Sequence, residues 1–142
     1  MEAPPRERSA QAVRLLALAD LGLRLAAGVI VTLLAVVFAL LTAFLVPFRV
    51  GGVPVPLSLV AALVGNVLLI RYARYATDSR LGIVGPVVAW LAVMLAFGAR
   101  TTEGDLVVTG DWRGLGTLFI GAVAFAVAGF LAVAPTPPRS KA

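Results

Sequence analysis

Three carboxylates and three glycines lie within one short polar stretch in the second half of the chain. The carboxylates are Glu103, Asp105 and Asp111, and the glycines are Gly104, Gly110 and Gly114. Carboxylate oxygens beside glycine turns are ligands that Ca²⁺ and Mg²⁺ prefer, and a carboxylate pair can act as general acid and base. The spacing differs from that of an EF-hand loop, and no nucleophile or second base accompanies the acids.

The same stretch also fits a turn between two helices. Gly104-Asp105 and Gly110-Asp111 are turn dipeptides, Asp111 suits the N-terminus of a following helix, and Trp112 suits a membrane interface. We favour this turn, cap and anchor over partner docking, and both over metal binding or catalysis, and we predict no metal site. The candidate functional residues of the stretch are Glu103, Gly104, Asp105, Asp111 and Trp112.

The composition removes several classes of chemistry. The chain has neither cysteine nor histidine, so disulfides, thiolate metal sites, histidine zinc sites and a histidine general base are excluded. We predict no cofactor. The basic balance, 12 Lys and Arg against 7 Asp and Glu, could indicate nucleic acid. Because the basic residues lie in short segments between apolar runs, we interpret them as membrane-topology signals and expect no nucleic-acid partner.

Four charge-free apolar runs dominate the sequence. The chain is 61% apolar with a mean hydropathy of +1.01, whereas soluble domains are about 45–50% apolar. A helix of about 20 apolar residues crosses a ~30 Å hydrocarbon core. We therefore predict an all-α integral membrane protein, a four-transmembrane-helix bundle formed by a single domain over residues 9–134. The expected spans are about 25–46, 53–70, 81–98 and 115–134.

The ends of the chain are polar. Residues 1–8 contain two prolines and three charges after Met1 and Glu2, and we expect them to be disordered. Ser9 is the expected N-cap of an interfacial helix that leads into the first span, with Asp20 and Arg24 paired four residues apart. The apolar run is 22 residues long, longer than the ~7–15 of a signal peptide, so we favour an uncleaved segment. Residues 135–142 form a basic tail.

The distribution of arginine and lysine predicts the topology, because cytoplasmic loops carry the excess of these residues. The N-terminal segment, the connection after the second span and the C-terminal tail hold nine together, and the other two connections hold three. We expect both termini in the cytoplasm and residues 100–113 outside. Three arginines of the second connection are expected to meet lipid headgroups: Arg71, Arg74 and Arg80.

Inside the four runs there is no ionisable side chain. Asn66 is the most polar residue there, expected one turn from the cytoplasmic end of the second span. We favour an interhelical hydrogen bond for it over a substrate contact. The lack of a membrane carboxylate argues against proton-driven export. Trp90 lies in the middle of the third run, where aromatic packing is its expected role.

The segments GPVVAW, ending at Trp90, and EGDLVVTGDW, starting at Glu103, resemble a family of small actinobacterial membrane proteins classed as a domain of unknown function. The resemblance covers about residues 51–134. It implies a plasma membrane protein with four spans and supplies no activity. It directs attention to Trp90, Glu103, Gly104 and Asp105.

Three functions are compatible with these patterns. We favour a non-catalytic integral protein of a bacterial plasma membrane, an accessory or scaffold component of a membrane complex. Its expected partners are membrane lipid and either another membrane protein or a second copy of itself. The first alternative is a small transporter or channel subunit with a pore between protomers. The second is a membrane enzyme that uses Glu103, Asp105 and Asp111 at the outer face.

Overall fold

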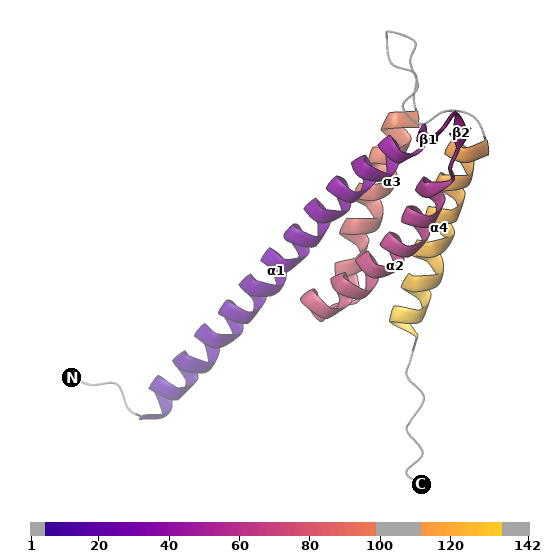
Figure 1. Cartoon of the computed structure of the whole chain (residues 1–142). Helices are drawn as coiled ribbons and strands as arrows, with labels where there is room; N and C mark the ends of the chain where they lie inside the picture. Colours follow the sequence, from indigo (N-terminus) through magenta and orange to yellow (C-terminus); the bar gives the residue numbers. More distant parts are fainter. Residues whose placement is uncertain (1–4, 99–111, 135–142) are drawn as a thin grey trace.

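The structure of the chain, a computed structural model, describes residues 5–98 and 112–134. Within these residues it consists of four long helices, one short 3₁₀ turn and a two-stranded hairpin (Figure 1). The elements are α1 (Pro5–Leu45), β1 (Arg49–Val50), β2 (Val53–Pro54), α2 (Leu57–Thr77), η1 (Leu81–Ile83), α3 (Val84–Gly98) and α4 (Trp112–Val133).

All four helical segments are long and apolar enough to cross a membrane. They are Gln11–Leu45, Leu57–Thr77, Leu81–Gly98 and Trp112–Val133. The expected all-helical class and the expected number of four membrane-length helices are therefore confirmed for the described residues. Large apolar side chains such as Leu33, Phe119 and Phe130 face outward, as they do in a bundle whose surroundings are hydrocarbon.

Helix α1 is a single unbroken helix of 41 residues. It begins at Pro5, because proline is well suited to the first turn, where its missing N–H has no helical partner. This start precedes the expected N-cap, Ser9, and takes in residues 5–8 of the tail that we expected to be disordered; residues 1–4 lie outside the described part. No break separates the expected interfacial helix from the first span. Pro47, just beyond Leu45, cannot continue the helix.

A tight hairpin joins α1 to α2. Val50 pairs with Val53 in antiparallel register, and Gly51 and Gly52 between them have φ angles of 57° and 83°. Two consecutive residues with positive φ are typical of the hairpin turn that Gly-Gly favours. Helix α2 therefore has other bounds than the expected second span, 53–70: Val53 and Pro54 belong to the hairpin, α2 begins at Leu57, and it continues to Thr77.

Helix α2 continues past Ile70 because arginine and tyrosine do not stop a helix. Long basic side chains can extend toward the membrane surface while their backbone remains helical. The helix ends at Thr77. The next residue, Asp78, has a left-handed backbone (φ 46°), and its N–H donates to the Arg74 carbonyl. The Ser79 Oγ then accepts a 3.2 Å hydrogen bond from the Leu81 N–H, which starts η1.

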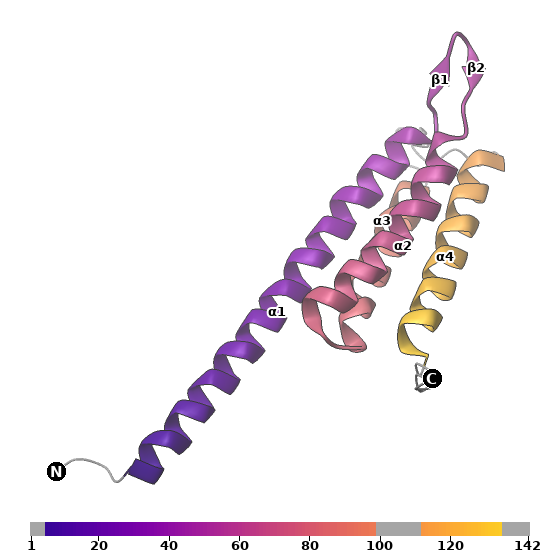
Figure 2. The ribbon, with the colours of Figure 1, turned by 60° about the horizontal axis from the view of Figure 1, so that its bottom comes forward.

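Three contacts between helices hold the bundle together: α2 with α4, α1 with α3, and α1 with α2. Helix α2 packs against α1 and α4, and α3 packs mainly against α1 (Figures 1 and 2). Small residues allow the close approach of α1: Ala35, Ala39 and Ala43 recur every four residues and are fully buried. Larger side chains fill the space between helices α2, α3 and α4: Leu69, Ile70, Trp90, Met94 and Phe125.

Candidate functional site

Most of the predicted outer-loop residues lie outside the described part of the chain. Glu103, Gly104, Asp105 and Asp111 belong to residues 99–111, so their predicted roles stay predictions. Trp112 is the first residue of α4 and is exposed. Among the described residues there is no group of three or more acidic side chains that could hold a metal ion.

A buried polar seam runs along the contact between α2 and α4; we define it by Ser58, Asn66, Thr117 and Gly121. The Ser58 and Thr117 hydroxyl oxygens are 2.9 Å apart. The Thr117 hydroxyl donates to the Arg113 carbonyl at 2.7 Å, so its only proton is used and Ser58 is the donor in the pair. These side chains are fully buried.

Asn66 makes the interhelical hydrogen bond that we expected. Its Nδ2 donates to the Gly121 carbonyl at 3.2 Å. Its position differs from the expectation, however. Because α2 runs from Leu57 to Thr77, Asn66 lies near the middle of the helix and not one turn from its cytoplasmic end.

Trp90 packs in the core beside the seam. Its ring meets Phe125 edge to face, with centroids 5.4 Å apart and an angle of 72°. A Cβ on Gly121 would collide with the Trp90 ring and touch the Asn66 amide. Gly121 therefore lets α4 approach both side chains. The Asn66 Oδ1 and the Trp90 Nε1 are buried and have no hydrogen-bond partner among the described residues.

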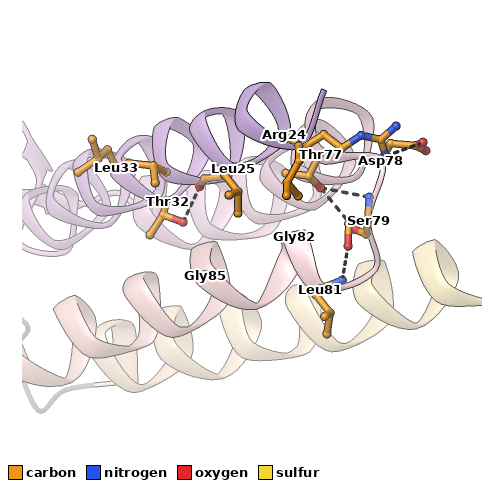
Figure 3. A pocket seen from close by; sticks show the side chains of 13 residues that line it. Arg24, Leu25, Thr32, Leu33, Thr77, Asp78, Ser79, Leu81, Gly82 and Gly85 are labelled. Atoms are coloured by element: carbon orange, nitrogen blue, oxygen red, sulfur yellow. Dashed lines mark hydrogen bonds and ion pairs between the residues drawn. The ribbon is translucent and has the colours of Figure 1, made fainter. Parts of the chain in front are cut away.

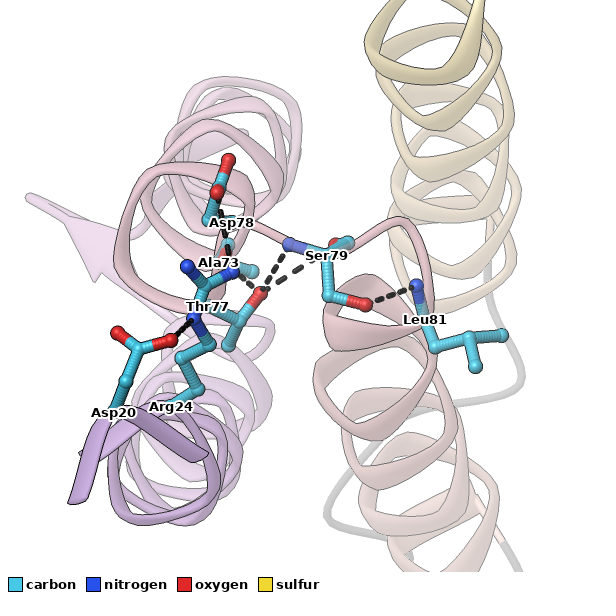
Figure 4. A network of polar contacts seen from close by, with 7 residues as sticks. All are labelled: Asp20, Arg24, Ala73, Thr77, Asp78, Ser79 and Leu81. Atoms are coloured by element: carbon cyan, nitrogen blue, oxygen red, sulfur yellow. Dashed lines mark hydrogen bonds and ion pairs between the residues drawn. The ribbon is translucent and has the colours of Figure 1, made fainter. Parts of the chain in front are cut away.

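An ionic network joins α1 to the end of α2 (Figure 4). Arg24 Nε donates to Asp20 Oδ2 at 2.7 Å, which confirms the predicted pair. Arg24 Nη1 also donates to Asp78 Oδ2 at 3.1 Å. This second contact was not predicted, because nothing in the sequence indicates that residues 54 positions apart would meet.

The backbone beside this network is held by Thr77. Its hydroxyl donates to the Ala73 carbonyl at 2.7 Å, and the Ser79 N–H donates back to that hydroxyl at 3.3 Å. A Cβ on Gly82 would collide with the Thr77 side chain. The glycine therefore allows the start of the third helical segment to pack directly on the end of α2.

An open groove of about 740 Å³ lies next to the network, between α1 and the connection from α2 to α3 (Figure 3). Arg24, Thr77, Asp78 and Ser79 lie at one end of the groove, and Leu33 lies at the other, next to Thr32. One wall comes from α1: Leu21, Leu25, Gly28, Val29, Thr32 and Leu33. The facing wall is Leu81, Gly82 and Gly85, and the polar end is Arg24, Thr77, Asp78 and Ser79.

The three arginines predicted to meet lipid headgroups are close in sequence to Thr77, Asp78 and Ser79, which form part of the polar end of this groove. Arg71 and Arg74 occupy the last two turns of α2, and Arg80 precedes η1. Arg71 and Arg80 are exposed and Arg74 is half-buried. The groove itself was not predicted, since it depends on how α1 and α3 diverge, and no local pattern indicates that angle.

No protein-family model, curated protein or solved structure matches the chain. The function must therefore be inferred from the chemistry of the described residues. These provide a buried polar seam, an ionic network with an adjoining apolar groove, and the long free portion of α1 that extends past the network (Figure 1).

Proposed function

We propose that the chain is a non-catalytic integral protein of a bacterial plasma membrane that serves as an accessory or scaffold component of a membrane complex. One observation carries this proposal. The portion of α1 at residues 11–23, here called the arm, extends beyond the other helices (Figures 1 and 2) and exposes a series of large apolar side chains. They are Val13, Leu15, Leu16, Leu18, Leu21 and Leu23.

The length of α1 argues that the arm lies outside the hydrocarbon. With about 1.5 Å of rise per residue, 41 residues extend about 60 Å, twice the ~30 Å of a hydrocarbon core. To hold the whole helix in the core, α1 would have to tilt by about 60°, beyond the 0–40° range of membrane helices. The portion from Arg24 to Leu45 extends about 33 Å, which matches one crossing.

The ionic network supports this placement. Arg24 pairs with Asp78 at the polar turn where α2 ends, and charged groups avoid the hydrocarbon. The arm thus begins at the level where α2 leaves the membrane. By the positive-inside count, that side is the cytoplasm and both termini lie there.

Exposed leucines on a cytoplasmic helix require a partner. Contiguous apolar surface of this kind marks interaction sites, and an apolar helix face fits a groove on another protein. The arm supports docking over the interfacial helix that we expected, because lying on the membrane surface needs a bend near Arg24 and α1 is unbroken there. The resemblance to an actinobacterial family stays a prediction and adds no activity.

The two alternatives have less support. In the seam, Ser58, Asn66 and Thr117 are buried and bonded within one chain, so a transport pore would have to lie between protomers. Flux in proteoliposomes would favour it. The enzyme alternative depends on Glu103, Asp105 and Asp111, and loss of an activity in a membrane-inserted Asp105→Asn variant would favour it.

Photo-crosslinking in native membranes tests the proposal. A photoreactive phenylalanine derivative replaces Leu18 on the arm or, as the matched control, Leu41 in the first span, which is also exposed. We expect position 18 to crosslink to one distinct membrane-associated protein and position 41 to crosslink to none. Crosslinks from position 18 to lipid alone, or to a second copy of the chain, would contradict the accessory role.

A further inference from the structure

We propose that the groove between α1 and the α2–α3 connection binds one aminophospholipid, a lipid whose headgroup carries both a phosphate and a primary ammonium. The headgroup lies at Arg24 and Asp78, and an acyl chain lies along the groove toward Leu33 (Figure 3). This inference goes beyond the proposed function, since it requires the membrane-spanning arrangement but no protein partner.

The groove has the size and the polarity of an amphiphile site. Its volume of about 740 Å³ falls within the range of roughly 300–1,000 Å³ found for ligand pockets. Its length is lined mainly by aliphatic side chains, including Leu25, Val29 and Leu81, and its charged side chains, Arg24 and Asp78, lie together at one end. The Thr32 hydroxyl on the apolar length donates to the Gly28 carbonyl of its own helix. A ligand that is polar at one end and apolar along its length matches this division.

Glycines bring the two walls together along the groove. A Cβ on Gly85 would collide with the Thr32 hydroxyl of α1, and a Cβ on Gly82 would collide with Thr77 of α2. The first turns of the third helical segment therefore approach α1 and α2 closely. Because α1 and α3 diverge toward this end of the bundle (Figure 1), a wedge remains open to the side.

The length of the groove along α1 is about the thickness of the hydrocarbon in one membrane leaflet. From Arg24 to Leu33, nine residues further along α1, the helix rises about 14 Å. Half of a ~30 Å hydrocarbon core is about 15 Å. With Arg24 at the membrane surface, the apolar part of the groove lies in the adjoining leaflet, where the surrounding solvent is acyl chain.

The donors and acceptors at the polar end select the headgroup. The Arg24 guanidinium has five N–H donors, and two of these bond Asp20 and Asp78. The remaining donors suit a phosphate, which arginine binds in charge-assisted hydrogen bonds. Asp78, the carboxylate that lines the groove, contacts Arg24 through Oδ2, which leaves its Oδ1 to accept from an ammonium.

The net charge at the polar end of the groove also favours some lipid headgroups over others. Two carboxylates and one guanidinium leave an excess negative charge in the network, which disfavours phosphatidylglycerol, since that lipid has a phosphate and no cation. Phosphatidylcholine has a cation without an N–H donor, so it cannot bond the carboxylates. Arg71, Arg74 and Arg80 are close to Asp78 in the chain and would favour an anionic lipid on general grounds. The comparison of the three headgroups is therefore decisive.

Competition in native mass spectrometry tests the proposal. The full chain in mild detergent is mixed with equal amounts of phosphatidylethanolamine, phosphatidylglycerol and phosphatidylcholine that carry identical acyl chains. We expect one phosphatidylethanolamine per chain, retained at least about five-fold over either competitor. Equal retention of the three lipids, or preference for phosphatidylglycerol, would overturn the proposal.

Blocking variants test the location. Val29→Trp fills the groove, and Val37→Trp is its matched control, because both valines are exposed on α1 (60% and 53%) and Val37 does not line the groove. We expect the first to lose retention and the second to keep it. Leu25→Trp, on the same wall, serves as a second blocking variant if Val29→Trp does not fold. Blocking variants that fold, by helical circular dichroism, and retain lipid like the control would refute the site.

Headgroup variants separate the polar end from the apolar length. Asp78→Asn removes a carboxylate charge at the groove end. We expect this variant to retain phosphatidylethanolamine and phosphatidylcholine equally, since the acyl chain still fits. Unchanged preference for phosphatidylethanolamine in Asp78→Asn would show that the ionic network does not recognise the headgroup and would overturn the assignment.

Discussion

Arg24 and Asp78 are 54 positions apart in the chain, and their side chains are joined by a 3.1 Å ion pair (Figure 4). Both are well exposed, and exposed ion pairs contribute little to stability. The pair matters instead for position. It is a contact between α1 and the turn that ends α2, at the point where the arm separates from the other helices.

Removal of this pair should therefore loosen the arm with little loss of stability. The chain has no cysteine, so spin labels can be placed at Leu18→Cys and Tyr75→Cys alone. We expect electron–electron resonance to give a narrow distance distribution between them, and Arg24→Gln to broaden it while the melting temperature stays almost unchanged. Asp20→Asn is the control, because it leaves the Arg24–Asp78 bond in place. Distance distributions of equal width in all three proteins would contradict the role of the Arg24–Asp78 pair in positioning the arm.

Gly121→Ala should destabilise the bundle. The added methyl group would collide with the Trp90 ring and press on the Asn66 amide, and overpacking of this kind costs about 1–3 kcal/mol. Gly129→Ala on the same helix is the matched control, since its Cβ would make an ordinary 3.7 Å contact with Ile83. Reversible unfolding in mixed micelles measures both. Similar unfolding free energies for the two variants would contradict the close packing of Gly121 against Trp90 and Asn66.

The Ser58–Thr117 bond is open to a double-mutant cycle. Ser58→Ala and Thr117→Val each remove one hydroxyl of a buried pair whose oxygens are 2.9 Å apart. Interhelical hydrogen bonds in membranes have coupling energies of about 0.6 kcal/mol, so we expect a favourable coupling of this order. The unfolding free energies of the wild type, both single variants and the double variant give its value. A coupling indistinguishable from zero would contradict the bond.

The sequence predicts the helical content well because hydrophobic length is a local property. Each of the four membrane-length helices overlaps one charge-free run, and the Asp20–Arg24 pair follows from helical spacing alone. The end of α2 lies past the expected span because hydropathy indicates where hydrocarbon ends and not where a helix ends. A helix leading into the first span was expected, and in the structure the two form one helix, α1.

For contacts between helices, the sequence predicted the type of interaction but not the partner residue. Asn66 was expected to bond another helix, and it does, but its acceptor is a backbone carbonyl, which every residue carries. The partner depends on which faces of α2 and α4 meet. The groove depends on the divergence of α1 from α3 and on glycines, which are frequent throughout this chain and so give no specific signal.

The predicted topology can be tested with single cysteines, which the natural chain does not contain. Tyr75→Cys lies on the last turn of α2 at an 86% exposed position, and the arginine count predicts that this end of the helix is in the cytoplasm. Asp105→Cys belongs to the connection that we predict on the opposite side. In intact spheroplasts, a membrane-impermeant maleimide should label position 105 and leave position 75 unlabelled, and detergent should make both reactive. Labelling of position 75 before permeabilisation would show that the chain has the opposite orientation in the membrane. The arm would then lie outside the cell, where a cytoplasmic partner could not reach it.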